Sequence, residues 1–191
     1  MILALLQLAA APGPGPSFDC ARARSAVERS LCANAELAAL DREEARLYRL
    51  ALRGAPAARR AHLVARQREF LAGRNRCGED LEPFDQCIRN AYLEDIAEMR
   101  RIAGISDKGG LSSGPVRYRC DSNYPDAWVT RFALDPEQAW VALPARQEGQ
   151  PLVARAGDGG RLTGRYDTGQ VLDADGRRLR LSARICVPVG R

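Results

Sequence analysis

The stretch Ile105 to Pro115 (ISDKGGLSSGP) decides how this chain folds, because it separates two halves whose apolar residues follow different periods. Its composition is that of a linker, with little apolar side chain to bury. Before it, apolar residues recur at helical spacing; after it, they alternate as in half-buried strands. The sequence therefore predicts an α+β protein of two domains. These are a disulfide-stapled small helical bundle at 17–104 and a small antiparallel β-barrel at 115–191, joined by a linker at 105–114.

The first half contains four helical segments with recognisable ends. Ser25 and Glu28 form a capping box, in which the serine hydroxyl accepts a hydrogen bond from the third helical amide and the glutamate reaches back. This box starts a short helix that ends near Cys32. Three longer helices are predicted from Asn34 to Gly54, from Ala57 to about Asn75, and from about Phe84 to Ala103, where Gly104 ends the last one. Three antiparallel helices and a short leading one can bury their apolar faces together.

The second half reads as a series of short strands. Alternation is clearest from Arg178 to Val187, which we predict as one strand with its arginines facing water. Turn sequences such as Asp135-Pro136 and Asp175-Gly176 separate the other candidates. Those candidates are 116–120, 127–134, 138–143, 152–155, 161–166 and 170–172. Several short strands at this spacing predict a small antiparallel barrel.

Six cysteines occur, at Cys20, Cys32, Cys77, Cys87, Cys120 and Cys186. An even number without a CxxC pair indicates disulfides in an oxidising compartment rather than a zinc or redox site. The last two bracket the strand-patterned half, so a bridge between them would tie its first strand to its last. For the first four, local pairing of Cys20 with Cys32 and of Cys77 with Cys87 is favoured. Spacing alone leaves the crossed pairing open.

The N-terminal stretch from Ile2 to Ala11 is apolar and ends in small residues, which is typical of a signal peptide. It is too short to span a bilayer. It lacks the usual positive charge at its start, and a disordered or helical stub is the alternative interpretation. With the disulfides, it predicts a periplasmic or secreted protein. Residues 1–16 would then be signal peptide and spacer, and the mature chain would have no integral membrane segment.

The formal net charge of +5 comes almost entirely from arginine, since Lys108 is the only lysine. Acidic residues are interspersed throughout, so a solvated mixed surface is predicted rather than a nucleic-acid site. Four aromatic residues of the second half are predicted as barrel core rather than as a base-stacking platform. They are Tyr124, Trp128, Phe132 and Trp140.

Residue patterns typical of an enzyme are weak in this sequence. His62 is the only histidine, and its position in the middle of a helix among arginines indicates a solvated surface role. By periodicity, the carboxylate pairs Glu43-Glu44 and Glu94-Asp95 fall on exposed helix faces, without the pKa separation that acid–base chemistry needs. No metal-ligand cluster or phosphate-binding glycine loop is evident. We therefore predict no enzymatic activity, no cofactor and no metal.

A longer succession of residues in the first half is more specific. It consists of Phe18-Asp19-Cys20-Ala21, Ser25-x-x-Glu28-x-x-Leu31-Cys32, Leu40-Asp41, Tyr48, Gln67-Arg68-x-Phe70-Leu71, Arg74-x-x-Cys77, Cys87 and Tyr92. This succession resembles the LprI-type domain over residues 18 to about 103, with Phe70 where that family usually has tryptophan. The resemblance implies a small secreted or periplasmic helical module of a family named for a lysozyme-inhibitor lipoprotein.

The second half carries its own motif series. Val116-Arg117-Tyr118-Arg119-Cys120 opens it, Thr163-Gly164-Arg165-Tyr166 lies near its middle, Asp175-Gly176 precedes an apolar strand, and Cys186 closes it. This order resembles the MliC/PliC family of C-type lysozyme inhibitors over about residues 115 to 188. The resemblance implies an eight-stranded barrel. It also implies that a loop serine and the lysine of a KG pair enter the lysozyme cleft and engage its catalytic carboxylates.

The chain departs from that family at both contact positions. Thr163 stands in place of the serine in a loop one residue short, and Asp175 stands in place of the lysine, where a carboxylate would repel carboxylates. Arg165 or Arg177 could supply the missing cation, since a guanidinium binds a carboxylate bidentately. The predicted binding residues are therefore Thr163, Gly164, Arg165, Tyr166 and Arg177. A purely structural interpretation is that Asp175-Gly176 is a common hairpin turn.

Together these observations predict a secreted or periplasmic inhibitor of C-type lysozyme that blocks the active-site cleft with a loop of the barrel. Such lysozymes are usually basic, so a basic inhibitor gains no long-range steering toward them. The alternative is a non-inhibitory cell-envelope binding or scaffold protein that keeps both folds, for which Asp175 and the shortened loop are the evidence. The sequence does not indicate an oligomeric state.

Overall fold

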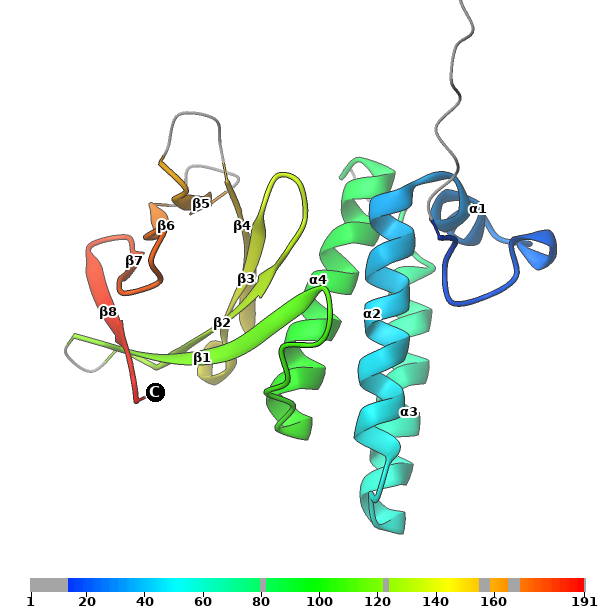
Figure 1. Ribbon diagram of the computed structural model, residues 1–191, viewed down its shortest axis with the longest axis horizontal. Helices are drawn as coiled ribbons and strands as arrows, with labels where there is room; N and C mark the ends of the chain where they lie inside the picture. The colour runs from blue at the N-terminus through cyan, green and yellow to red at the C-terminus, as the bar shows by residue number, and fades with distance from the viewer. Residues whose placement is uncertain (1–13, 80–81, 122–123, 155–158, 165–168, 191) are drawn as a thin grey trace, which may run out of the picture.

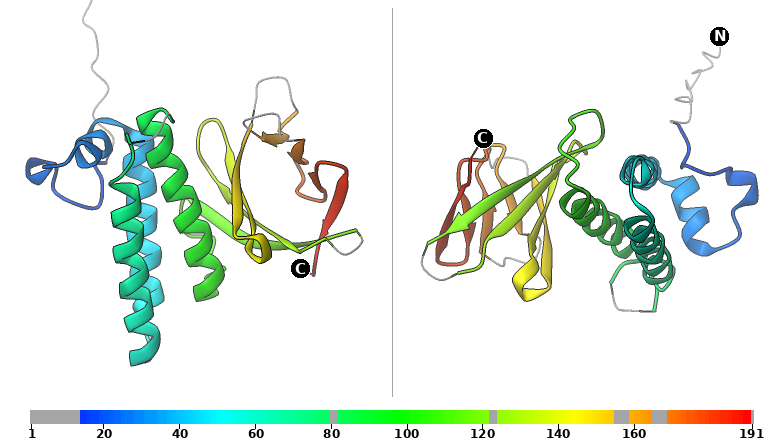
Figure 2. Two further views of the ribbon diagram at one scale, coloured as in Figure 1. Left: turned by 180° about the vertical axis from the view of Figure 1, so that it is seen from behind. Right: turned by 90° about the horizontal axis from the view of Figure 1, so that it is seen from below.

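The computed structural model describes residues 14–79, 82–121, 124–154, 159–164 and 169–190 (Figure 1). Its helical half comprises η1 (Cys20–Arg22), α1 (Ala26–Ala33), α2 (Ala35–Leu52), α3 (Ala57–Arg74) and α4 (Phe84–Ala103). The three long helices lie side by side, and α1 packs across one end of α2 (Figures 1 and 2). The predicted helical bundle is confirmed.

Local capping explains where these helices begin and end. Ser25 Oγ accepts a hydrogen bond from the Glu28 amide at 3.1 Å, and Glu28 Oε2 accepts one from the Ser25 amide at 2.9 Å, so the capping box is present. The Asn34 side chain caps α2 by accepting from two amides of its first turn. Gly104 ends α4 with φ +65°, a left-handed conformation that glycine adopts without strain.

The second half is a closed antiparallel barrel in which each strand pairs with the next and β8 returns to β1. Its strands are β1 (Ser112–Cys120), β2 (Ala127–Phe132), β3 (Gln138–Leu143), β4 (Glu148–Ala154), β5 (Leu162–Gly164), β6 (Gln170–Leu172), β7 (Leu179–Leu181) and β8 (Arg184–Pro188), with the short helix η2 (Pro144–Arg146) between β3 and β4. Closure leaves no unpaired edge strand. The predicted barrel is confirmed.

The single strand predicted from Arg178 to Val187 is wrong in one respect. The chain turns at Ser182-Ala183, so that Leu181 pairs with Arg184 and two strands, β7 and β8, form a hairpin. Ser182 has φ +54°, and the turn contains no glycine to signal it. Paired residues of neighbouring strands share a face, and a two-residue turn pairs odd-numbered residues of β7 with even-numbered residues of β8. The buried side chains are therefore odd-numbered in β7 and even-numbered in β8. Leu179 and Leu181 are buried, whereas Ile185 and Val187 are each 52 % exposed.

The three disulfides join Cys20 to Cys32, Cys77 to Cys87 and Cys120 to Cys186. The favoured local pairing of the first four cysteines is confirmed, as is the bridge between the first and last strands. Cys120 and Cys186 are also register partners in the β1–β8 pairing that closes the barrel.

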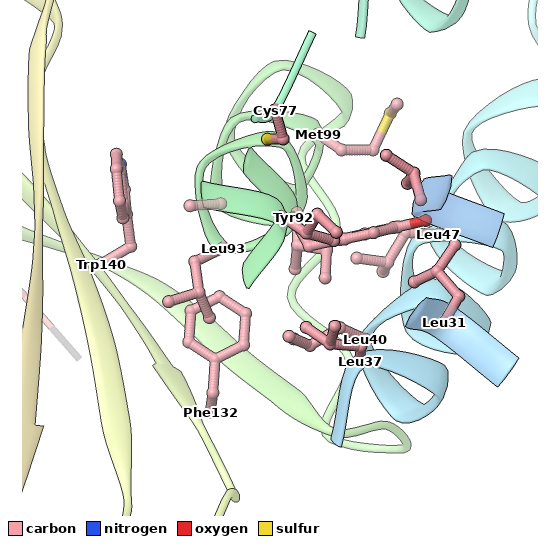
Figure 3. Packing of buried hydrophobic residues seen from close by; sticks show 14 of the residues in the cluster. Leu31, Leu37, Leu40, Leu47, Cys77, Tyr92, Leu93, Met99, Phe132 and Trp140 are labelled. Atoms are coloured by element: carbon pink, nitrogen blue, oxygen red, sulfur yellow. The ribbon is translucent and has the colours of Figure 1, made fainter. Parts of the chain in front are cut away.

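The helical half packs against the outer wall of the barrel. Phe132 of β2 and Trp140 of β3 belong to the same buried cluster as Leu93 of α4 and the other helical core residues (Figure 3). Their prediction as barrel core is therefore wrong. Successive residues of a strand face opposite sides, so Ala139 and Val141 fill the barrel while Trp140 points outward to the helices.

A buried arginine fastens the two halves together. Arg100 of α4 is 0 % exposed and donates to the Ser112 carbonyl and the Ser112 hydroxyl, each at 2.6 Å, and to the carbonyls of Ile105, Asp107 and Gly114. Glu43 of α2 accepts from the Ser112 amide at 3.2 Å. The segment predicted as a linker thus wraps around a guanidinium. Strand β1 already begins within it, at Ser112 rather than at Val116.

Candidate functional site

The structure encloses the hydroxyl that was predicted to protrude. Thr163 lies in the middle of β5, between Val153 of β4 and Val171 of β6. Its Oγ1 is shielded from solvent and has no hydrogen-bond partner among the described residues. Gly164 is the buried last residue of the same strand. Arg165 and Tyr166 lie outside the described residues. A direct contact of the Thr163 hydroxyl with a partner is therefore not supported by this arrangement.

Arg177, in contrast, stands out from the barrel. It belongs to the turn 173–178 between β6 and β7, and its side chain is 84 % exposed. Asp175 Oδ1 accepts a hydrogen bond from the Arg177 amide at 2.9 Å, and Asp175 Oδ2 lies 3.3 Å from Arg177 Nε. The aspartate that replaces the expected lysine thus positions the neighbouring cation.

Two side chains of the barrel hold this turn in place. Tyr118 of β1, which is almost fully buried, donates its hydroxyl to the Gly176 carbonyl at 2.6 Å. Arg131 of β2 donates to the Ala174 carbonyl at 3.3 Å. Gly176 has φ +67°, which favours glycine at this position. Sequence reasoning used Tyr118 only as part of a motif. Tyr118 lies 58 residues before Gly176 in the sequence, so no local pattern indicates that it anchors the turn.

Of the predicted binding residues that the structure describes, Thr163 and Gly164 lie apart from Arg177. The chain leaves β5 at Gly164 and enters β6 at Gln170, then leaves β6 at Leu172 and enters β7 at Leu179. Gly164 therefore lies beside the Gln170 end of β6, and the Arg177 turn follows the opposite end of β6 at Leu172. The candidate site that the described residues support is the anchored turn with Arg177 at its tip.

The predicted exposure of the carboxylate pairs is wrong for three of the four residues, because Glu43, Glu44 and Asp95 are buried. Burial raises the pKa of Glu43, but donors from Arg46 and Ser112 outweigh it and lower that pKa to about 2. Burial, together with the nearby charges of Asp95 and Asp41, raises the pKa of Glu44 to about 8. Such separation is typical of acid–base pairs, yet neighbouring helical positions point about 100° apart. The two carboxyls accordingly have different neighbours.

These two carboxyls should give opposite pH dependences of stability. The pKa of Glu44 in the folded protein lies above its ordinary value of 4.5. Between pH 4.5 and 8 this carboxyl is therefore deprotonated in the unfolded chain but still protonated in the folded protein, so the free energy of unfolding falls as the pH rises. Glu44→Gln is expected to match the wild type near pH 4.5 and to exceed its unfolding free energy at pH 8 by on the order of 3 kcal/mol. Urea unfolding of the oxidised protein across this pH range measures the difference.

The adjacent Glu43→Gln variant is the matched control. The folded pKa of Glu43 lies below 4.5, so its contribution is present above pH 4.5 and is lost as the pH falls toward 2. This variant should be less stable than the wild type at pH 7 and similar to it near pH 2. A Glu44→Gln variant that is less stable at pH 8 than at pH 5, relative to the wild type, would contradict the assignment.

Among the described residues, no group of three or more histidine, cysteine or acidic side chains could hold a metal ion. None of the helices in the described ranges is long and apolar enough to cross a membrane. The fold and the site define a disulfide-stapled α+β protein in which a closed barrel, backed by a helical bundle, presents a cation on an anchored turn.

No family model and no solved structure matches the chain. The chain is similar to lipoprotein LprI of Mycobacterium tuberculosis (strain ATCC 25618 / H37Rv) and of Mycobacterium bovis (strain ATCC BAA-935 / AF2122/97). Each is 28 % identical over 109 residues, which are 57 % of this chain and 51 % of the relative. The chain thus spans about half the length of these relatives. The similarity supports the LprI-like interpretation. The MliC-like interpretation of the barrel stays a prediction.

Proposed function

We propose that this protein is an extracytoplasmic binding protein that inhibits a C-type lysozyme by occupying its active-site cleft, and that it has no enzymatic activity of its own. Three disulfides favour an oxidising compartment. Similarity to lipoprotein LprI and the resemblance of both halves to lysozyme-inhibitor families support the choice of target class. The observation that carries the proposal is the anchored, outward-pointing Arg177.

The chemistry of the contact follows from the geometry of the turn. A lysozyme cleft contains catalytic carboxylates, and a guanidinium binds carboxylates through charge-assisted, often bidentate hydrogen bonds. Asp175 engages Nε of Arg177, which leaves the terminal nitrogens for a partner. Tyr118 and Arg131 fix the backbone of the turn beforehand, so less conformational freedom is lost on binding. In this proposal Asp175 is a positioning residue rather than a repulsive one.

Arg177 variants test this contact. Arg177→Ala is expected to weaken lysozyme inhibition by at least about tenfold, since a lost charge-assisted contact is worth about 1.5–3 kcal/mol. Arg177→Glu should weaken it further, because it adds repulsion to the acidic cleft. The measurement is the inhibition constant against purified C-type lysozyme, using the oxidised protein.

Arg178→Ala is the matched control, because Arg178 is the exposed next residue and should leave inhibition unchanged. Arg165→Ala tests the other cation of the sequence prediction. Undiminished inhibition by both the Arg177→Ala and the Arg165→Ala variants would show that neither arginine supplies the contact.

A second candidate function is a cell-envelope binding or scaffold protein without inhibitory activity. The enclosed Thr163 hydroxyl favours it, because the barrel then lacks the donor that the MliC/PliC resemblance implies. The same lysozyme assay separates the two functions. Wild-type protein that neither binds nor inhibits any C-type lysozyme supports the scaffold function.

A further inference from the structure

A cavity lies where the helical half meets the barrel, and neither half forms it alone. Its volume is about 540 Å³. Helices α3 and α4 form one side, and β3, η2 and the start of β4 form the other. Cavities of this size hold small ligands or single side chains of a protein partner. We call it the interhalf cavity.

Aromatic rings form part of its wall. Phe70 of α3 and Trp140 of β3 line the cavity (Figure 3 shows Trp140 between the strands and α4). Gly149 of β4 allows the indole to lie against the neighbouring strand, since a Cβ at that position would come within 2.5 Å of Trp140 Nε1. The ring is thereby held as a fixed wall. Aromatic faces attract cations through their quadrupole.

The charges of the lining are acidic in balance. Five carboxylates line the cavity, against three arginines. Two of these arginines are already paired, Arg66 with Asp95 at 2.6 Å and Arg101 with Glu98 at 2.6 Å. The third, Arg74, is buried and donates to the Tyr92 hydroxyl at 2.6 Å. Each of the three guanidiniums thus makes at least one contact within the protein, although Nε of Arg66 is buried without a hydrogen-bond partner among the described residues.

Three of the carboxylates have no such partner. Glu69 of α3, Glu94 of α4 and Glu148 of β4 make no hydrogen bond or ion pair with any described residue. They come from three different elements around one cavity. All three are exposed to solvent, and Arg66 provides a nearby positive charge for Glu94. A ligand that enters therefore meets acidic side chains from both halves of the protein.

Asp95 provides an independent indication of a missing ligand. This residue lines the cavity and is 4 % exposed, and only its Oδ1 is paired, with Arg66. Its Oδ2 is buried without a hydrogen-bond partner among the described residues. A buried acceptor without a donor is costly, so such groups normally have a partner. Nε of Arg66, its ion-pair partner, is likewise buried and unpaired among the described residues. Because Asp95 Oδ2 is shielded from solvent, a ligand with N–H donors would reach it only after the surrounding side chains move.

We propose that the interhalf cavity binds the guanidinium of an arginine side chain presented by a partner protein. A guanidinium is planar, carries five N–H donors and stacks on aromatic faces, so it suits a cavity that is lined by carboxylates and by aromatic rings. An ammonium group could not stack in this way. The inference is independent of the lysozyme proposal, because it concerns a different surface and does not require a particular partner.

The two tryptophans make the cavity directly observable. Trp128→Phe leaves Trp140 as the only tryptophan of the chain. In this background, N-acetyl-arginine amide is the probe, and N-acetyl-citrulline amide is its neutral analogue of nearly the same shape. We expect a saturable change of Trp140 fluorescence with the arginine probe, and binding of the citrulline probe that is weaker by at least about tenfold.

Variants that remove charges from the cavity test whether the fluorescence change comes from binding there. Adding Glu94→Gln and Glu148→Gln to the Trp128→Phe background should weaken arginine binding by at least about tenfold. The matched control adds Glu79→Gln and Asp121→Asn, two exposed acidic residues outside the cavity, and should leave binding unchanged. Equal binding of the two probes, no saturable response, or equal affinity in both variant pairs would overturn the proposal. Circular dichroism of each variant verifies that the fold is kept.

Discussion

Arg100→Ala is expected to lower the free energy of unfolding by about 3–5 kcal/mol, the usual cost of removing one partner from a buried ion pair. Arg100 is fully buried, and it donates to carbonyls on both sides of the segment that joins α4 to β1. Arg100 Nη2 also lies 3.4 Å from Glu43 Oε1. Loss of Arg100 would leave these carbonyls without their side-chain donor, and Glu43 with donors from Arg46 and Ser112 only. Urea or guanidinium denaturation at pH 7 measures the change.

The neighbouring Arg101→Ala variant is the matched control for this experiment. Arg101 pairs with Glu98 at 2.6 Å, but its side chain is 30 % exposed. An exposed pair of this kind contributes at most about 1 kcal/mol. Arg100→Ala should also separate the unfolding of the two halves, because the guanidinium connects them. Equal stabilities of the two variants would mean that the buried network does not hold the halves together.

Removing the barrel disulfide is expected to have a similarly large effect. The Cys120–Cys186 bridge closes a loop with a sequence separation of 66, and the loop-entropy relation gives about 4 kcal/mol for that length. Three register pairs join β1 to β8 at this seam, with one further backbone hydrogen bond beyond each end of the pairing. Without the bridge, the seam can open and expose two strand edges. We expect the Cys120→Ala/Cys186→Ala double variant to be destabilised by this amount in chemical denaturation.

The Cys20→Ala/Cys32→Ala double variant provides the comparison. Its bridge spans a sequence separation of 12, for which the same relation gives about 3 kcal/mol. It also lies at the periphery, next to the short helix α1. The barrel variant should therefore be the less stable of the two. The reverse order would show that loop length and barrel closure do not govern the effect.

Several features of the site were within reach of sequence reasoning, and others were not. The anchored turn could be predicted from the dipeptide Asp175-Gly176, because this pair of residues is typical of a turn. Its anchor Tyr118 was not, because a hydrogen bond between residues 58 positions apart leaves no local trace. Thr163 was placed in a contact loop through the resemblance to the MliC/PliC motif order, although 161–166 was also predicted as a strand. Pairing with β4 and β6 instead makes it the centre of a strand.

The burial of the Glu43 and Glu44 carboxyls was also not predicted from the sequence. Helical periodicity was used to assign Glu43 and Glu44 to an exposed helix face, but Glu44 lies four residues after Leu40 and three before Leu47, on the apolar face of α2. The assignment of Glu43 fails because the segment after α4 covers it, with the Ser112 amide donating to its carboxylate. Glu44 is buried within the bundle itself, beside Gln67 of α3 and Asp95 of α4. A one-dimensional pattern has no information on what packs against the far side of a helix.

What the sequence by itself determined is the set of local elements: four helices with recognisable ends and a series of alternating strands. These depend on neighbours within a few residues, where propensity and periodicity act directly. The local pairing of Cys20 with Cys32 and of Cys77 with Cys87 was favoured by the sequence and decided by the structure. The docking of the barrel on α4, the burial of Arg100 and Trp140, and the interhalf cavity were decided only by the tertiary structure. They arise where two surfaces from distant parts of the chain meet, and burial there depends on both surfaces at once.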